Sequence, residues 1–321
     1  MVLYLTEGDV EKILTMKDAI QVVEEAMKEW GGGRATNNPR ARVEIGGRVL
    51  NVLSAGVQAT RTFGFKAYTT LADGTRGTSF LILNYDTTTG NLEAVVQAGT
   101  ITRTRTGAAT AVATKYLARK DSRVLGIIGA GKIGELQVKG LMEGNGFEKV
   151  IVYDPIQESM KRLVALVRDT YSVDSIEASN SSEIAKKSDV VVTATWSEQP
   201  VIEGRDLRPG THLNAVGSNS PKRAEVDEAS FERAALVVVD HRAQCMLEAG
   251  DIIRAVAAKK VDWSEIIDLP ELVAHRERYS RRDEDITIFK SVGLAIEDVA
   301  VARRVVEKAL ELGIGTQIPV S

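Results

Sequence analysis

The chain has 321 residues, with 41 lysine and arginine residues against 44 aspartate and glutamate residues, so its formal net charge is −3. At roughly 100–200 residues per domain, this length predicts two domains. Hydrophobic residues make up 44% and charged residues 26% of the chain, which is typical of a globular protein and excludes both a disordered chain and a strongly basic nucleic-acid-binding protein.

The N-terminal third of the chain predicts a mixed α+β unit. A helix begins after Thr6, where Asp9 completes a capping box, and a second helix is predicted over 16–30, with apolar residues on one face and Gly31 at its end. Strand-like runs follow at 41–45, 49–54, 62–70, 78–84 and 91–97. The turn signals between them are Gly46-Gly47, Ala72-Asp73-Gly74 and Thr88-Thr89-Gly90. Consecutive short strands of this kind predict an antiparallel sheet or a partial barrel.

From residue 122 the pattern changes to alternating strands and helices. The predicted strands are 124–128, 149–154, 189–195, 212–216, 235–240 and 286–289, with helices over 134–143 and 157–169. Continuous apolar runs, such as 236–239, are expected in a parallel sheet that is covered on both faces. The predicted fold class is therefore α/β, a Rossmann-type doubly wound parallel sheet plus a smaller α+β domain. A last amphipathic helix over 294–312 ends at Gly313.

The strongest local motif is Gly129-Ala-Gly131-Lys-Ile-Gly134, which follows the strand 124–128 directly and begins a helix. The first glycine allows a tight turn, the second lets a pyrophosphate approach the backbone, and the third lets the helix pack on the strand. The helix N-terminus, with Lys132 and Ile133, is expected to face the phosphates. Asp154 ends the next strand, and its carboxylate can accept the ribose hydroxyls and would repel a 2′-phosphate. The motif predicts an NAD(H) site and makes NADP(H) less favoured.

Two further strand ends are expected to flank the nicotinamide half of this site, because ligands of doubly wound sheets bind outside the carboxyl ends of the strands. One strand end contributes Thr195 and Trp196, and the other contributes Val216, Gly217 and Ser218. Trp196 is interpreted either as a stacking residue or as a packing residue.

Basic residues gather before the glycine motif. They are Arg34, Arg40, Arg42, Arg48, Lys66, Arg103 and Arg105. A guanidinium group suits a carboxylate, which it binds as a bidentate pair, but a solvated strand face explains most such arginines as well. Lys66 interrupts an apolar run, so it points either inward to a cleft or outward from an edge strand.

Cysteine and histidine are scarce. The single cysteine, Cys245, excludes an intrachain disulfide framework, and three histidines leave few ligands for a zinc site. The N-terminus has no basic segment before its short apolar stretch, so no signal peptide is predicted, and no apolar run reaches the roughly 18 residues of a membrane span. We expect a cytoplasmic protein without a metal and without a membrane or nucleic-acid partner.

An ordered set of short motifs spans nearly the whole chain. The set consists of Gly64-Phe-Lys66, Thr104-Arg105-Thr106-Gly107-Ala108, Tyr116-Leu-Ala-Arg-Lys120, Gly129-Ala-Gly131, Asn214-Ala-Val-Gly217, Glu225-Val-Asp227 and Thr287-Ile-Phe-Lys-Ser291-Val-Gly293-Leu-Ala-Ile-Glu-Asp298. Together these motifs resemble the ornithine cyclodeaminase/mu-crystallin family, which includes archaeal-type alanine dehydrogenases and ketimine reductases. The resemblance implies a homodimer. It also implies a substrate-binding and dimerisation domain over 1–120 and 299–321, with an NAD-binding Rossmann domain over 121–298 inserted between them.

The resemblance implies roles for individual residues as well. Arg40 and Arg105 match positions that bind the substrate carboxylate, and Lys66 matches the active-site lysine, whose pKa the two arginines are expected to lower. Asp227 matches an acid near the substrate nitrogen, with a helix-start acid as the alternative. The further cofactor contacts expected from these motifs are Thr106, Ser291 and Gly293.

Departures from the family pattern favour one branch of it. In the cyclodeaminase branch the corresponding motif is similar to Phe-Asp-Ser-Val-Gly, whereas this chain has Lys290 between Phe289 and Ser291. The motif with lysine resembles that of the ketimine-reductase branch. The Gly-Pro-Gly-Lys loop is replaced by Ser220-Pro-Lys-Arg223. The leading prediction is an NAD(H)-dependent oxidoreductase that interconverts a 2-imino acid, linear or cyclic, and its L-amino acid by hydride transfer. The alternatives are an ornithine or lysine cyclodeaminase with internally recycled NAD, and a non-catalytic small-ligand-binding protein of the mu-crystallin type.

Overall fold

The computed structural model describes residues 1–71 and 76–320, and the chain forms two compact units. Unit 1 contains Met1–Arg105 and Leu294–Ser321, and unit 2 contains Thr106–Gly293. Both boundaries between the units lie earlier in the chain than 120 and 299, the positions that the sequence predicts. The first of them falls within the long helix α3 (Gly99–Leu117). The turn signal at Ala72-Asp73-Gly74 lies outside the described residues.

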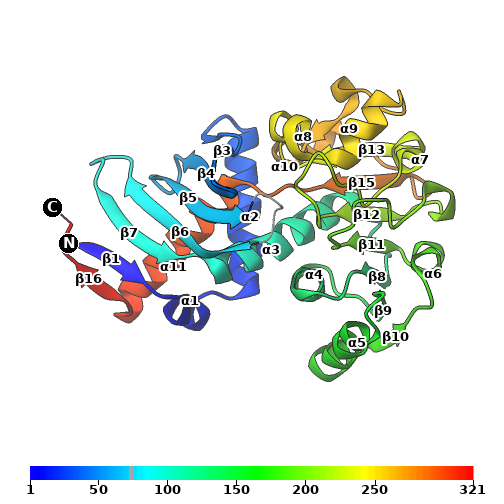
Figure 1. Cartoon of the computed structure of the whole chain (residues 1–321), viewed down its shortest axis with the longest axis horizontal. Helices are drawn as coiled ribbons and strands as arrows, with labels where there is room; N and C mark the ends of the chain where they lie inside the picture. The colour runs from blue at the N-terminus through cyan, green and yellow to red at the C-terminus, as the bar shows by residue number, and fades with distance from the viewer. Residues whose placement is uncertain (72–75, 321) are drawn as a thin grey trace. The chain divides into compact units, whose positions relative to one another are not determined.

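Unit 1 is built on an eight-stranded sheet with helices on one face (Figure 1). The strand order is β16-β1-β7-β6-β5-β4-β2, with β3 paired to β4. The neighbouring strands are antiparallel except β1 and β7, which are parallel. Helix α11 packs against β4, β5 and β6, and α2 packs against α11. The bounds are β1 (Val2–Leu5), β2 (Ala35–Asn37), β3 (Ala41–Ile45), β4 (Arg48–Val57), β5 (Thr62–Leu71), β6 (Arg76–Asp86), β7 (Leu92–Gln97), β16 (Thr316–Ile318), α1 (Glu7–Ile13), α2 (Met16–Gly31) and α11 (Ala295–Leu312).

Local sequence signals set the ends of the helices in unit 1. The backbone N–H of Asp9 donates to the Thr6 hydroxyl oxygen and the Asp9 carboxylate accepts the N–H of Thr6, so the predicted capping box is confirmed. Helix α11 ends at Gly313, whose φ of 66° lies in the left-handed region that favours glycine. The N-cap residue of α11 makes no side-chain cap, and the Ile296 N–H donates to Asn37 Oδ1 at 3.0 Å. This bond anchors the first turn of α11 to β2.

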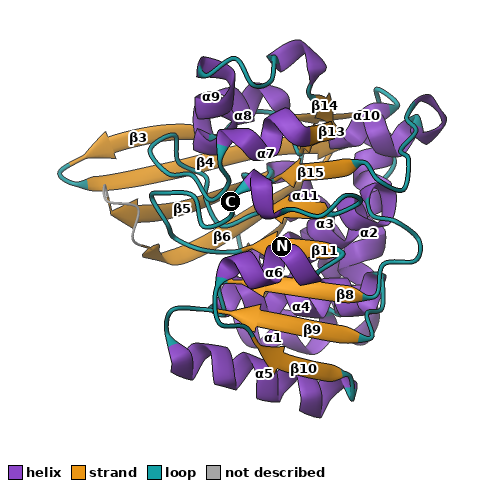
Figure 2. Cartoon of the chain, turned by 90° about the vertical axis from the view of Figure 1, so that its right-hand side faces the viewer, coloured by secondary structure: helices purple, strands orange, loops and turns teal. Residues whose placement is uncertain are grey.

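Unit 2 is a parallel sheet of eight strands with helices on both faces. Its order is β10-β9-β8-β11-β12-β15-β13-β14, and β10, β9, β8 and β11 follow one another upward in Figure 2. The neighbouring pairs are parallel. The chain order reverses between β8 and β11, which makes this the switch point of a doubly wound sheet. The strands are β8 (Val124–Ile128), β9 (Lys149–Tyr153), β10 (Asp174–Glu177), β11 (Val190–Thr193), β12 (His212–Ala215), β13 (Ala234–Val239), β14 (Ile267–Asp268) and β15 (Ile286–Lys290). The helices that follow α3 are α4 (Lys132–Gly144), α5 (Gln157–Tyr171), α6 (Ser181–Lys187), α7 (Glu228–Arg233), α8 (Arg242–Glu248), α9 (Gly250–Ala257) and α10 (Leu269–Ala274).

Both faces of this parallel sheet are buried. Val190 and Val192 belong to one hydrophobic cluster and Val191 to another, so alternate residues of the same strand pack on opposite faces. This arrangement explains the continuous apolar runs in the sequence, and the predicted α/β fold class is confirmed. None of the described helices combines the length and the apolar character that a membrane span requires.

Candidate active site

Two buried cations meet two buried carboxylates in unit 1. Lys66, on β5, has its Nζ 2.6 Å from Oδ2 of Asp298, in the first turn of α11. Arg105, on α3, places Nη1 2.6 Å from Glu297 Oε2 and Nε 3.1 Å from Asp298 Oδ1. The lysine side chain is 2% exposed, and both carboxylate side chains are fully buried. Asp298 therefore bridges the two cations, which the sequence predicts to be site residues.

Arg40 is the third cation of this cluster. It is 8% exposed, whereas Arg42 and Arg48 are exposed on the hairpin of β3 and β4, and it is close enough to Lys66 to lower the pKa of the lysine. Arg40, Lys66 and Arg105 thus gather near the two buried carboxylates of Glu297 and Asp298. Guanidinium groups bind carboxylates well, so the arginines of this cluster suit a ligand that carries a carboxylate.

The protonation of Lys66 is finely balanced. Burial lowers the pKa of Lys66, the Asp298 carboxylate raises it, and Arg105 and Arg40 lower it further, so that it is about 8. The expectation that the arginines lower this pKa is confirmed, although burial is the larger cause. Burial would also lower the pKa of Arg105, but Asp298 and Glu297 raise it, and Arg105 stays charged. A lysine with a pKa of about 8 can act both as a cation and as a proton donor near neutral pH.

Sequence reasoning missed the roles of Glu297 and Asp298, although both stand in one of the family motifs. A signal was present, because two adjacent acids interrupt an otherwise apolar first turn of α11. Carboxylates on the buried face of a helix require buried cations nearby. The cations in this case come from β5 and α3, which lie far away in the sequence.

The glycine motif of unit 2 has the geometry of a dinucleotide-binding turn. Gly129 has a φ of 103°, and a Cβ on Gly134 would lie only 1.9 Å from the Gly129 carbonyl oxygen, so both positions require glycine. A Cβ on Gly131 would meet no atom within 4 Å, and no side chain caps the start of α4. The first N–H groups of α4 are therefore open to an anion, which fits the phosphates of NAD(H).

Asp154, directly after β9, lies against this loop. Its Oδ2 accepts the N–H of Ala130 at 2.7 Å, and its Oδ1 accepts the N–H of Ile156 at 2.7 Å. The structure thus brings the predicted ribose-binding acid and the predicted phosphate loop together. Lys132 and Ile133 are the first two residues of α4, and Thr106 lies on the part of α3 that belongs to unit 2.

A single buried carboxylate joins the turns after β11 and β12. Glu225 accepts the N–H of Thr195 at 2.6 Å and its hydroxyl at 2.8 Å, and it accepts the N–H of Gly217 at 2.7 Å. Trp196 is 51% exposed, and the Arg223 guanidinium lies 4.3 Å from the centre of its ring. Next to these turns, Val216 is half-buried and Ser218 is buried.

The turn after β15 is held in a similar way by Asp240, directly after β13. Its Oδ2 accepts the Ser291 hydroxyl at 2.9 Å and the Gly293 N–H at 2.8 Å. The predicted cofactor contacts of this region therefore form the backbone frame at the carboxyl ends of the strands.

Asp227 begins a helix. Its Oδ1 accepts the N–H of Ser230 at 2.9 Å, the Ser230 hydroxyl at 2.6 Å and the N–H of Gly204 at 2.9 Å. Asp227 is thus the N-cap of α7, and its role beside the substrate nitrogen stays a prediction.

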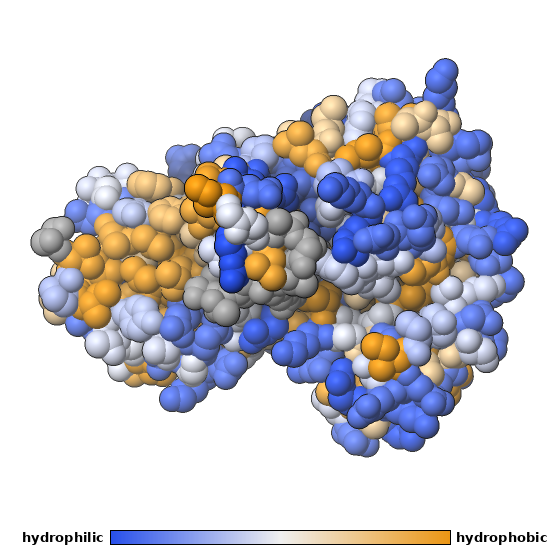
Figure 3. Space-filling model, in the orientation of Figure 1, coloured by the Kyte–Doolittle hydropathy of each residue, from blue (hydrophilic) through white to orange (hydrophobic). Residues whose placement is uncertain are grey.

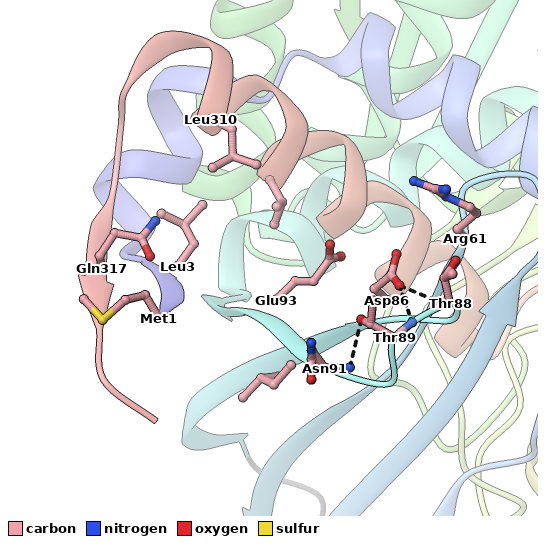
Figure 4. A pocket seen from close by; sticks show the side chains of 12 residues that line it. Met1, Leu3, Arg61, Asp86, Thr88, Thr89, Asn91, Glu93, Leu310 and Gln317 are labelled. Atoms are coloured by element: carbon pink, nitrogen blue, oxygen red, sulfur yellow. Dashed lines mark hydrogen bonds between the residues drawn. The ribbon is translucent and has the colours of Figure 1, made fainter. Parts of the chain in front are cut away.

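A separate surface pocket of about 470 Å³ lies in unit 1 (Figure 4). Its lining includes Leu3 of β1, Asp86 at the end of β6, Glu93 of β7, Leu310 of α11 and Gln317 of β16. The Asp86 carboxylate accepts the N–H groups of Thr88 and Thr89 within its own turn. None of the predicted site residues lines this pocket.

Comparison with known proteins gives full-length similarities. The model of the ornithine cyclodeaminase/mu-crystallin family matches residues 2–313. Alanine dehydrogenase of Archaeoglobus fulgidus is 33% identical over 320 residues, covering 98% of each chain. The structure of Thermococcus litoralis Delta(1)-pyrroline-2-carboxylate reductase in complex with NADH and L-proline is similar with a TM-score of 0.92 and 34% identity, covering 99% of this chain and 100% of the other. An archaeal alanine dehydrogenase dimer with bound NAD is similar with a TM-score of 0.92 and 32% identity, covering 99% of each chain.

Proposed function

The chain belongs to the ornithine cyclodeaminase/mu-crystallin family, and from this premise we propose that it is an NAD(H)-dependent oxidoreductase that interconverts a 2-imino acid and its L-amino acid. The observation that carries the proposal is the buried cluster of Lys66, Arg105 and Asp298 in unit 1. It is supported by the similar reductase with bound NADH and L-proline, an amino acid with one carboxylate.

Arg40 and Arg105 bind the carboxylate of the imino acid. Arg105 is held by Glu297 and Asp298, so its guanidinium keeps a fixed orientation, which lowers the entropy lost when a ligand binds. A guanidinium group binds a carboxylate as a bidentate pair. The proposed substrate class is therefore the 2-imino acids, linear or cyclic.

Reduction of the imine adds a hydride to the carbon and a proton to the nitrogen. Bound NADH supplies the hydride. Lys66 holds the proton and donates it toward the nitrogen, because its pKa of about 8 keeps the ammonium form dominant at neutral pH while making proton transfer less costly than for an ordinary lysine. Asp298 keeps Lys66 oriented and takes no part in the transfer itself.

We propose NAD(H) rather than NADP(H) as the cofactor. The glycine loop and the uncapped start of α4 hold the pyrophosphate. Asp154 stands beside the loop with a carboxylate that accepts ribose hydroxyls and repels a 2′-phosphate.

We also propose that the chain forms a homodimer through the face of the unit 1 sheet that is opposite to α11. Partly exposed apolar side chains stand in register on this face, and they are Phe63, Phe65, Leu81, Leu83, Tyr85 and Val95. Figure 3 shows apolar side chains gathered over β6 and β7. A broad exposed apolar surface of this kind marks a protein interface, and one of the similar structures is a dimer.

NADH consumption with a panel of imines tests the proposed reaction. The panel contains pyruvate plus ammonia, glyoxylate plus ammonia, pyrroline-2-carboxylate and piperideine-2-carboxylate. We expect stoichiometric NADH oxidation with at least one of them, and a loss of about 100-fold or more in Lys66→Met. Proline formation from ornithine at constant NADH would instead indicate a cyclodeaminase. Tight NADH binding without turnover of any substrate would indicate a binding protein.

A further inference from the structure

Lys290 has a partner that explains why a lysine stands in the Phe289-Lys-Ser291 motif. It is the last residue of β15 and is fully buried, and its Nζ lies 2.7 Å from Oδ2 of Asp251. Asp251 is in the first turn of α9 and is fully buried as well. Removing one partner of a buried ion pair leaves the other charge buried without compensation, which strongly destabilises the folded protein.

The other oxygen of Asp251 holds the backbone of the chain after β12. Asp251 Oδ1 accepts the N–H of Glu225 and, at 3.0 Å, the N–H of Val226. The Glu225 side chain then accepts the N–H groups of Thr195 and Gly217, as described above. A continuous series of contacts thus runs from Lys290 through Asp251 and Glu225 to the turns after β11 and β12.

The packing around this series leaves little room for adjustment. A Cβ on Gly217 would lie 2.2 Å from the Thr195 carbonyl oxygen and 2.4 Å from Glu225 Oε1. A Cβ on Gly250, at the start of α9, would lie 2.1 Å from the Arg223 carbonyl oxygen. The turns after β11 and β12 are therefore in close contact with each other, and the start of α9 packs closely on the segment just before Glu225. A shift of Asp251 is thus expected to move Glu225 and the backbone that it holds.

We propose that Lys290 is a positioning residue for the nicotinamide half of the cofactor site: by holding Asp251, it fixes the Glu225 carboxylate that joins the Thr195 and Gly217 turns. This inference rests on the proposed NAD(H) site of unit 2. Lys290 itself does not touch the cofactor in this scheme, because its ammonium group is buried against Asp251. An aspartate in its place, as in the Phe-Asp-Ser pattern, could not neutralise Asp251, so the lysine and Asp251 form a matched pair.

Binding of NADH to the full chain, followed by fluorescence titration, tests the proposal. Lys290→Met leaves the Asp251 carboxylate buried without a cation, and Glu225→Gln turns an amide N–H₂ group toward one of the two backbone donors. Both variants should raise the Kd for NADH by about tenfold or more, the cost of a lost hydrogen bond to a charged group. The double variant Lys290→Met with Asp251→Asn removes both charges and keeps an oxygen acceptor for the N–H groups of Glu225 and Val226. It should bind NADH within about threefold of the wild type.

Thr287→Val is the matched control, because Thr287 is buried on the same strand and its hydroxyl donates to the Leu117 carbonyl oxygen at 3.0 Å. Its Tm should fall while its Kd for NADH stays unchanged. A purely structural role for Lys290 would give the same pattern in Lys290→Met and would overturn the proposal. If Lys290→Met does not fold, Glu225→Gln and the double variant decide the question.

Two other results would also overturn the proposal. One is wild-type NADH affinity in Glu225→Gln. The other is a double variant that is as stable as the wild type but still binds NADH weakly, which would indicate a direct contact by Lys290. Failure of the wild type to bind NADH would instead refute the proposed function, and with it the assignment of these turns to the cofactor. At saturating NADH, the KM for the imino acid should stay unchanged in Glu225→Gln, because the cations of unit 1 are not altered.

Discussion

Replacing Asp298 by asparagine should shift the pH at which the enzyme loses its reductive activity. The Asp298 carboxylate, 2.6 Å from Lys66 Nζ, is the strongest influence that raises the pKa of Lys66 against burial and two arginines. Loss of an opposite charge at such a distance lowers the pKa of an amine by roughly 1–3 units. The pKa of about 8 in the wild type should therefore fall to about 5–7 in Asp298→Asn.

The sign of the effect follows from the role of Lys66 as a proton donor. The donor must be protonated, so kcat for imine reduction is highest below the pKa of Lys66 and falls as the pH rises through it. The wild type should lose activity near pH 8, and the variant should lose it one to three units lower. A shift of two units leaves about a tenth of Lys66 protonated at pH 7, so kcat at that pH should fall about tenfold. The measurement is kcat against pH at saturating NADH and imine.

Glu297→Gln is the matched control for this experiment. Glu297 contacts Arg105 at 2.6 Å, and among the described residues it is Asp298, not Glu297, that is paired with Lys66. The control should raise the KM for the imino acid and keep the falling limb of the pH profile near pH 8. The reasoning is refuted if Asp298→Asn lowers kcat but leaves the falling limb where it is in the wild type, because Lys66 would then not be the group that titrates.

Four further predictions concern other residues. Asp227→Asn should keep the cap of α7 and change turnover less than about threefold, whereas Asp227→Ala should destabilise the fold by about 1 kcal/mol; a large loss of kcat in the asparagine variant would show that this acid acts in catalysis. Asp154→Asn keeps an acceptor for the Ala130 N–H but removes the negative charge that repels a 2′-phosphate. The preference for NADH over NADPH in kcat/KM should therefore fall about tenfold, and an unchanged preference would argue against the proposed role of Asp154. Leu83→Arg should convert the dimer into monomers in analytical ultracentrifugation, with the exposed Glu158→Arg in unit 2 as a control that stays dimeric. Burial lowers the pKa of His212 to about 3, so the folded chain keeps this histidine neutral. The stability of the fold is therefore greatest above the unfolded pKa of about 6.5, and it falls by up to about 1.4 kcal/mol per pH unit below that value. Urea midpoints at pH 7 and pH 5 should differ less in His212→Gln than in the wild type, and an equal decrease of the midpoint in both proteins would contradict this account.

Segments with a strong local pattern could be predicted from the sequence, and strands that depend on distant pairing could not. The strand 124–128 matches β8 in both bounds, and the helix over 16–30 matches α2 to within one residue. The strands β1 and β16 were not predicted, because each has three or four residues and they pair with each other from opposite ends of the chain. Their stability comes from this long-range pairing, and local patterns carry no signal of it.

The side chains of the candidate site could likewise be predicted only in part from local sequence patterns. Arg40, Arg42 and Arg48 look alike in the sequence, but only Arg40 is buried, and the resemblance to a family distinguished it where spacing did not. Glu297 and Asp298 gain a role only because α11 returns to unit 1 at the end of the chain. Ion pairs between segments so far apart depend on the tertiary fold, which periodicity does not describe.

The two fully buried lysines of unit 1 and unit 2 show how the surroundings decide the chemistry of one residue type. Lys66 has one close carboxylate, Asp298, and two arginines nearby, so burial lowers its pKa to about 8 and makes it a usable proton donor. Burial would lower the pKa of Lys290 too, but the carboxylates of Asp251 and Glu225 raise it above the ordinary value. Lys290 therefore stays charged at the pH values where Lys66 titrates. A group with a fixed charge suits a positioning role, and a group that titrates near neutral pH suits proton transfer.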